Sequence, residues 1–415
     1  DGTSTSLART DCGADCAWPD ARYSVRMTNL GVGDLPLGFV ETGYDLHDRV
    51  VYSRAELPAG RQVLSARRYD PQGRLMQESL PADCCTAPPY WTLHSYDLLG
   101  RRVRQYVPGG PGRPAPAVTS WRHDGLTVTE TYPLGRDTVR TYNAVGGLVR
   151  VVDAALSGTQ YDYDAFGNIV RVRDARGAEV IATYDARGRR TSLFDPAAGL
   201  WLYGHYPLGE LKWQTNARGQ VTSFAYDRLS RPVTRSEAEG TTTWTWGQSR
   251  EARNVGTLAA VHSPGFAQAY AYDSLGRPGS VTSSLQATSF VTAMTYDPVT
   301  GLRDTLTYPA PTRSPALRVR HHYDRGRLVE LTDADTGASY WRLDALDARG
   351  HVSSESLGNG VRVVSQYDPV SGLLTAMLAR RDQWMRHLPA TGGRAAHRKL
   401  LEKSLQHFLR AGLKS

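Results

Sequence analysis

Several residue types and patterns are scarce in this sequence of 415 residues, and each scarcity excludes a class of protein. No stretch approaches the roughly 20 consecutive apolar residues that a membrane-spanning helix needs, so no such helix is predicted. Isoleucine occurs only at Ile169 and Ile181, whereas there are 22 tyrosines and 9 tryptophans. We therefore expect half-wet sheet faces covered by amphipathic aromatic side chains instead of a thick aliphatic core.

Lysine is also scarce, because Lys212 is the only lysine before Lys399. The formal net charge is +8, yet residues 379–415 carry nine basic and two acidic residues, so that the rest of the chain is close to neutral. A neutral body has no general attraction for phosphate backbones. No nucleic-acid partner is therefore predicted for the main body of the chain.

Cysteine occurs four times, as Cys12 and Cys16 and as the neighbours Cys84 and Cys85. This pattern offers too few ligands for a structural zinc site and lacks the thioredoxin-type spacing. A small local disulfide between Cys12 and Cys16 is favoured over free thiols, and a redox role comes last. Such a disulfide would indicate an oxidising compartment.

The sequence begins "DGTSTSLART", with neither an initiator methionine nor a charged and then apolar leader. We expect the chain to be a fragment, with residues 1–40 continuing an upstream β region.

One phrase, typified by "YDARGRR" from Tyr184, recurs about every 23 residues. The tyrosines, aspartates and glycines of its clear copies are Tyr44, Asp45, Tyr69, Asp70, Gly73, Tyr96, Asp97, Gly100, Tyr163, Asp164, Gly167, Tyr184, Asp185, Gly188, Tyr226, Asp227, Tyr272, Asp273, Gly276, Tyr296, Asp297, Tyr323, Asp324, Tyr367 and Asp368. Less perfect copies begin at Trp121, Tyr142, Tyr206, Trp246 and Leu346. Fifteen copies in register predict a repeat array over residues 41–377.

Each residue of the phrase has a physical reason. The segments before it alternate as strands do, so the tyrosine ends a strand. Aspartate suits the first position of a type I turn and glycine the last, where a left-handed conformation starts the next strand. The arginine that follows has three open roles: covering a neighbouring tyrosine ring, pairing with the aspartate of the next repeat, or pointing into solvent.

The period and the motifs "YDLLGRR", "YDARGRR" and "YDSLGRP" resemble the YD-repeat or Rhs-repeat proteins of bacteria, which are similar to the C component of insecticidal toxin complexes and to the teneurin shell. The resemblance covers roughly residues 40–375. It implies an all-β fold, a spiral β-sheet shell or cocoon. Fifteen copies give about 30 strands, a strip too small to enclose a toxin of ~100 residues, so we expect the shell to be incomplete. The resemblance also implies a secreted or cell-surface protein that sequesters a C-terminal toxin segment or meets companion toxin subunits.

Members of that family end the shell at a signature of the type Asp-Pro-x-Gly-Leu-x-Gly, which is associated with self-cleavage. The segments 297–302 and 368–374 each carry an extra residue before the glycine and lack the second glycine. We interpret both as ordinary repeat turns, and no self-cleaving residue is assigned.

Other candidate sites are weak. His321 and His322 would point to opposite faces of a strand, so a shared metal with Asp324 is not expected. The loop 108–114 lacks the Lys-Ser/Thr of a phosphate loop.

No catalytic residue, cofactor or metal is predicted, and the protein is not expected to be an enzyme. A shell or scaffold segment is the leading function, and a cell-surface carbohydrate-binding or adhesive repeat module is the alternative.

Residues 378–415 form a basic tail of different composition, in which residues 394–411 have the pattern of an amphipathic helix. Three origins stay open for it: a changed reading frame, a remnant or linker of a displaced toxin, or a functional membrane-active or partner helix.

Overall fold

The structure, a computed structural model, describes residues 3–12, 17–84, 88, 90–110, 115–310, 314–381 and 384–389. These residues form 34 β-strands and one 3-10 helix, η1 (Pro58–Gly60), which confirms the expected all-β class. The predicted tail helix at residues 394–411 lies outside the described residues. No described helix is long and apolar enough to cross a membrane.

The strands follow one another with short turns between them. The first nine are β1 (Ser4–Asp11), β2 (Tyr23–Leu30), β3 (Pro36–Tyr44), β4 (Val50–Glu56), β5 (Gln62–Tyr69), β6 (Leu75–Ser79), β7 (Ala82–Asp83), β8 (Trp91–Tyr96) and β9 (Arg102–Val107). The next nine are β10 (Ala117–Asp124), β11 (Thr127–Tyr132), β12 (Arg136–Tyr142), β13 (Leu148–Val152), β14 (Gly158–Tyr163), β15 (Ile169–Arg173), β16 (Glu179–Tyr184), β17 (Arg190–Asp195) and β18 (Gly199–His205). They are followed by β19 (Leu211–Thr215), β20 (Val221–Tyr226), β21 (Pro232–Glu237), β22 (Gly240–Trp246), β23 (Leu258–Ser263), β24 (Phe266–Tyr272), β25 (Pro278–Leu285), β26 (Thr288–Tyr296) and β27 (Arg303–Thr307). The last seven are β28 (Arg318–Asp324), β29 (Arg327–Asp333), β30 (Ser339–Leu346), β31 (Val352–Leu357), β32 (Val361–Tyr367), β33 (Leu374–Arg381) and β34 (Trp384–Pro389).

All of these strands belong to one antiparallel sheet, in which nearly every strand pairs with the strands before and after it in sequence. The exceptions lie near the N-terminus, where β5 also pairs with β7 and β6 pairs with β8. Strands β33 and β34 continue the sheet beyond residue 378, where the sequence had suggested that the repeat array ends.

Most tyrosines that end a strand sit at a β-bulge. The register shifts between Thr183 and Tyr184, for example, and again between Ala225 and Tyr226. Consecutive Tyr-Asp turns are two strands apart, so these bulges collect on one rim of the strip. Because a bulge bends its strand and increases the local twist, a rim of bulges makes the strip curl.

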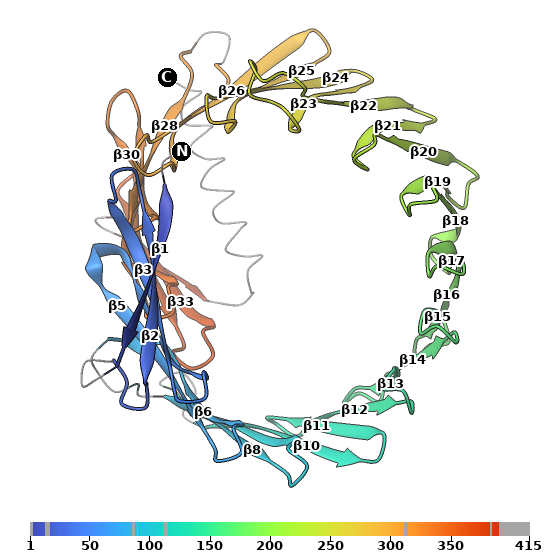
Figure 1. Cartoon of the computed structure of the whole chain (residues 1–415), viewed down its shortest axis with the longest axis vertical. Helices are drawn as coiled ribbons and strands as arrows, with labels where there is room; N and C mark the ends of the chain where they lie inside the picture. The colour runs from blue at the N-terminus through green and yellow to red at the C-terminus, as the bar shows by residue number, and fades with distance from the viewer. Residues whose placement is uncertain are drawn as a thin grey trace.

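The strip curls once around a ring, and strands β1 to β5 lie against β28 to β33 (Figure 1). The two ends touch through turns and side chains, which we call the seam: the Ala59 N–H donates to Asp324 Oδ2 at 2.6 Å, and Arg61 Nη1 donates to the Leu346 carbonyl at 2.6 Å. Among the described residues β1 and β34 do not pair with each other, so the sheet itself is open.

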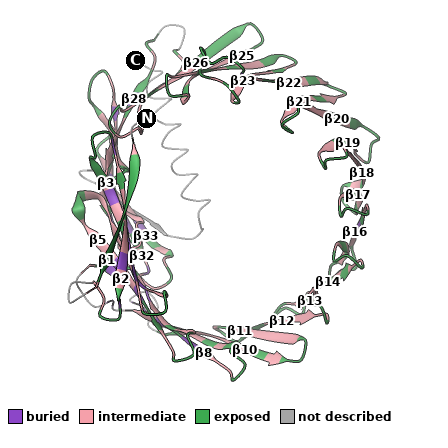
Figure 2. Cartoon of the chain, viewed as in Figure 1, coloured by how far each residue is buried: buried purple, intermediate pink, exposed green. Residues whose placement is uncertain are grey.

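Few side chains of this single-layer wall are buried (Figure 2). The one cluster of buried apolar residues among the described parts of the chain is Ala21, Val51, Tyr52, Leu64 and Ala66, in the N-terminal strands of the seam region. Cys12 packs against it and is disulfide-bonded, while Cys16 lies outside the described residues. Elsewhere, strand faces alternate between half-buried and exposed residues, as expected for sheet faces without a second layer.

Candidate functional site: a ring wall of linked corners

The repeated corner has the same geometry along most of the wall, and residues 184–190 are typical. The Gly188 N–H donates to the Asp185 carbonyl at 2.9 Å, which closes the turn. Asp185 Oδ1 accepts the N–H groups of Arg187 and Arg189 at 2.9 and 3.0 Å. Gly188 has a φ of +75°, a left-handed conformation in which a side chain is strained.

The arginine of the phrase pairs with the aspartate of its own corner. Arg189 Nε donates to Asp185 Oδ2 at 2.7 Å. This hydrogen bond, with the backbone N–H groups that the carboxylate accepts, lowers the pKa of Asp185 to about 2. The same arrangement with Arg231 lowers the pKa of Asp227.

In most clear copies of the phrase, the tyrosine ties its repeat to the preceding one. The Tyr184 hydroxyl donates to the Ile169 carbonyl at 3.0 Å, six residues after the preceding tyrosine, Tyr163. Equivalent hydrogen bonds join Tyr69 to Val50, Tyr96 to Leu75, Tyr163 to Leu148, Tyr272 to Leu258, Tyr296 to Pro278 and the Trp246 indole to Pro232.

The arginine ties its repeat to the following one. The Arg277 guanidinium lies 4.2 Å from the centre of the Tyr296 ring, and its Nη1 donates to the Gly301 carbonyl at 3.4 Å. Arg74 covers the Tyr96 ring in the same way at 5.0 Å. Of the three roles left open by the sequence, the structure thus combines the first with an ion pair to the arginine's own aspartate.

Some copies of the phrase depart from this corner. Asp48 and Ser230 occupy the glycine position with φ values of +59° and +58°. Asp297 and Asp368 begin turns that are one residue longer, because Gly301 and Gly372 bond back four residues instead of three.

The copy at Tyr323 forms a different turn. Asp324 is still in strand β28 and pairs with Arg327, so Arg325 and Gly326 alone make the turn. The Asp324 carboxylate pairs with Arg325 of its own turn, with Oδ1 3.7 Å from Nε, and its Oδ2 accepts the seam hydrogen bond from Ala59.

The two histidines that were considered as metal ligands make different contacts. His321 stacks against Tyr323, and its burial lowers the pKa of its imidazole. His322 Nε2 is 2.9 Å from Thr332 Oγ1. No group of three potential metal ligands occurs among the described residues.

Sequence reasoning missed two clusters. Buried Glu41 accepts hydrogen bonds from Arg26, Arg54 and Tyr52 at 2.6 to 2.9 Å. A second cluster forms around Asp344 in β30. Neither belongs to the repeated phrase, so only the pairing of neighbouring strands brings their members together.

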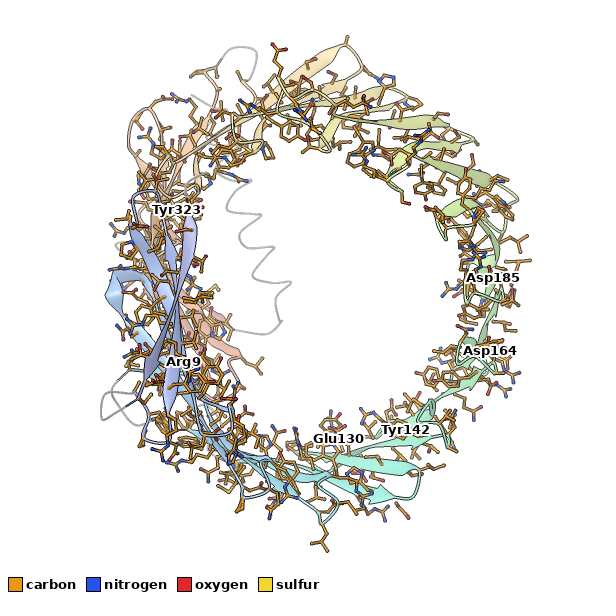
Figure 3. All side chains as sticks on the ribbon, in the orientation of Figure 1. Arg9, Glu130, Tyr142, Asp164, Asp185 and Tyr323 are labelled. Carbon is orange, nitrogen blue, oxygen red and sulfur yellow. The ribbon has the colours of Figure 1, made fainter. Side chains whose placement is uncertain are left out.

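Figure 3 shows that the described side chains leave the centre of the ring open, with Asp164 and Asp185 on neighbouring stretches of the wall. The wall therefore consists of corners most of which are fixed internally and linked to neighbouring corners.

Comparisons with known proteins agree with this geometry. The model of the RHS Repeat family matches residues 142–179, 163–199 and 206–242. A search of curated protein sequences finds no match.

Solved structures give the match for the whole strip. The crystal structure of TcdB2-TccC3 has a TM-score of 0.77 and 16% identity, over 92% of this chain and 23% of that chain. The same complex without its hypervariable C-terminal region has a TM-score of 0.75 and 16% identity, over 89% and 22%. A mutant of the Photorhabdus luminescens Tc holotoxin pore has a TM-score of 0.74 and 16% identity, over 89% of this chain and 22% of that chain.

The chain thus spans less than a quarter of the chains it resembles, and at this identity the likeness concerns the fold. The family model thus identifies Rhs repeats at residues 142–199 and 206–242, and the strip as a whole has the fold of the TcdB2-TccC3 chains.

Proposed function

We propose that this chain is a non-catalytic wall segment of an Rhs-type toxin protein, which encloses or presents a toxin segment. The observation that carries the proposal is the ring: a single layer of sheet curls until its ends touch, and its centre is free of described side chains (Figure 3). Ordinary domains cover a sheet with a second layer. A sheet that instead surrounds a space is suited to hold other protein.

The corner aspartates support a structural role in preference to a catalytic one. Their carboxylates accept two backbone N–H groups and in most corners an arginine as well, so they are held ionised and occupied. General acid or base catalysis requires a group whose pKa lies near the working pH. A carboxylate whose pKa is about 2, like that of Asp185, does not meet this requirement at neutral pH.

The partners that follow from this proposal are a C-terminal toxin segment or companion toxin subunits, and the location is outside the producing cell. The likeness in fold to TcdB2-TccC3, and to a Tc holotoxin pore that contains TccC3, supports both.

The corner aromatics argue against the carbohydrate-binding alternative. Sugar binding requires open aromatic faces. Here the corner aromatics already contact neighbouring repeats. The Tyr296 hydroxyl donates to the Pro278 carbonyl, and the Arg277 guanidinium covers the Tyr296 ring.

Protease protection tests the proposal. A flexible reporter peptide with one protease site is fused after residue 415, and its cleavage is compared with that of the same peptide fused to an unrelated β-protein. We expect cleavage to be several times slower on this chain, and faster again when the seam is opened by Asp324→Ala with Arg61→Ala. Equal rates on both carriers would contradict the proposal, as would specific sugar binding on a glycan array.

A further inference from the structure

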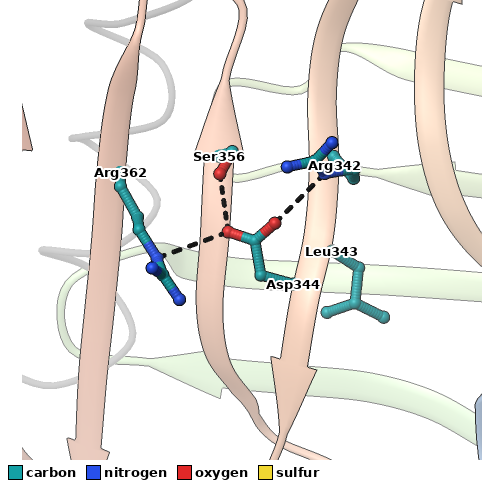
Figure 4. Close-up of a pocket in the computed structure, with 5 residues that line it drawn as sticks. All are labelled: Arg342, Leu343, Asp344, Ser356 and Arg362. Carbon is teal, nitrogen blue, oxygen red and sulfur yellow. Dashed lines mark hydrogen bonds and ion pairs between the residues drawn. The ribbon is translucent and has the colours of Figure 1, made fainter.

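An open cavity of about 360 Å³ lies on the wall over strands β30, β31 and β32, away from the Tyr-Asp corners. Its lining residues are Arg342, Leu343, Asp344, Ser356 and Arg362 (Figure 4). Two guanidinium groups thus flank a single carboxylate, and neither arginine belongs to the repeated phrase.

The sheet register explains why these side chains meet. Arg342 of β30 is opposite Ser356 of β31, which is opposite Arg362 of β32. Arg362 is in turn opposite Arg380 of β33. Residues directly opposite each other in a sheet project from the same face. Because neighbouring strands are ~4.8 Å apart, Arg342 and Arg362 start roughly 10 Å apart, with only a serine between them.

Asp344 lies closest to the Nε atoms of both guanidinium groups. It accepts hydrogen bonds from Ser356 Oγ at 2.6 Å and Arg342 Nε at 3.1 Å, and Arg362 Nε is 3.6 Å away. Arg362 Nε also donates to Ser354 Oγ at 3.0 Å. Although burial alone would raise it, the hydrogen bonds from Ser356 and Arg342 keep the pKa of Asp344 below its ordinary value.

The outer edges of the same guanidinium groups are open. The Nη groups of Arg342 and Arg362 have no hydrogen-bond or ion-pair partner among the described residues, and the two side chains are 59% and 62% exposed. The remaining charges of the row are Arg380, which is exposed, and Glu330, which is opposite Arg342 in β29. Three arginines against two carboxylates leave the row with net positive charge.

We propose that Arg342 and Arg362 bind a tetrahedral oxyanion of the phosphate type between their Nη groups. A planar carboxylate is satisfied by one guanidinium fork, whereas a tetrahedral dianion has enough oxygens to accept from two forks at once. Ser356 and Asp344 orient the forks before the ligand arrives, which lowers the entropic cost of binding. Ligands of this chemistry are free phosphate and organic phosphomonoesters.

Titration calorimetry of the full chain with inorganic phosphate at about 0.15 M salt tests the site, because long-range attraction between exposed charges is largely screened there. We expect saturable binding that weakens roughly tenfold or more in Arg342→Gln and in Arg362→Gln, since each loses a charge-assisted fork. Arg342→Lys, which keeps the charge but lacks the fork, should weaken binding to a lesser degree. This milder variant also serves if a glutamine variant does not fold.

Arg171→Gln is the matched control. Arg171 is likewise a half-exposed strand arginine of the same wall, but its guanidinium pairs with both Asp162 and Glu179. Its substitution should leave phosphate affinity unchanged.

Glycerol phosphate distinguishes the source of the anion: tighter binding than inorganic phosphate indicates a phosphomonoester, and equal binding indicates the free ion. The proposal is overturned if phosphate does not bind, if Arg171→Gln weakens it as much as Arg362→Gln does, or if acetate binds as well as phosphate.

Discussion

At the scale of single residues, each of the four residue types in the corner has its own structural role. Aspartate caps the turn, glycine supplies the left-handed backbone, tyrosine contacts the preceding repeat and arginine contacts the following one. The sequence predicted the first two roles because they are local and follow from the chemistry of a type I turn. The contacts of tyrosine and arginine depend on how repeats stack, so the sequence left their partners open.

At the glycine position of the turn, replacing a glycine should destabilise the chain, and introducing one should stabilise it. Gly188→Val should destabilise the chain by about 1–2 kcal/mol, because a β-branched residue is strained at a φ of +75°. Leu156 has the same place in the turn that begins at Asp153, with a φ of +62° and an 85% exposed side chain. Leu156→Gly should therefore stabilise the chain by about 0.5–1 kcal/mol. Urea midpoints of both variants measure this, and equal shifts in one direction would refute the assignment of strain.

The corner carboxylates predict the dependence of stability on pH. The pKa of Asp185 is lowered to about 2 by its hydrogen bond from Arg189 and by its backbone N–H donors, whereas an aspartate in the unfolded chain titrates near 3.9. A lowered pKa in the folded state stabilises the fold above the unfolded pKa, and this contribution is lost as the pH falls toward 2. The melting temperature should fall between about pH 4 and pH 2, and less steeply in Asp185→Asn with Asp227→Asn. A flat profile there would contradict the prediction.

At the scale of elements, most consecutive strands are joined by a short turn, and most of the Tyr-Asp corners are linked to neighbouring repeats. This organisation replaces a hydrophobic core, since stability comes from interfaces between adjacent units. The alternation in sequence predicted the strands well. It could not predict that β33 and β34 extend the sheet past residue 378, because the phrase itself stops there while the strand pairing continues.

The link between repeats can be measured by a double-mutant cycle on Arg277 and Tyr296. The guanidinium lies 4.2 Å from the ring centre, so Arg277→Ala and Tyr296→Leu should show a coupling energy of about 0.5–1 kcal/mol. A cycle between Arg277 and Tyr184, which have no contact, should show coupling near zero. Equal coupling in both cycles would mean that the arginine acts through the whole strip instead of its neighbouring repeat.

At the scale of the whole molecule, the strip curls in one direction and its ends meet at the seam. The number of strands in the sequence predicted a curled, incomplete shell. The contacts of the seam could not be predicted from the sequence. Ala59 and Asp324 are 265 positions apart, and Arg61 and Leu346 are 285 apart. Their approach depends on the curvature added up over all the strands between them, from β5 to β28 or β30, which no local pattern encodes.

Opening the seam should expand the molecule. Asp324→Ala with Arg61→Ala removes two of the hydrogen bonds that join the ends and leaves every strand pair intact. Small-angle scattering should then give a larger radius of gyration at an unchanged circular dichroism spectrum. Asp185→Ala with Arg189→Ala, which removes an ion pair inside one corner, is the control and should leave the radius unchanged. An unchanged radius in the seam variant would show that other contacts suffice to close the ring.

Pairing between sequence neighbours also sets the order in which the wall can form. A hairpin needs only the residues that have already left the ribosome or a secretion channel, and closing a short loop costs little entropy. The strip can thus grow from its N-terminal end as the chain emerges, one hairpin on the last, without waiting for distant segments. Contacts such as those of Ala59 with Asp324 can form only after some 265 further residues have emerged. Until then the growing wall would have a lateral opening through which a following segment could enter.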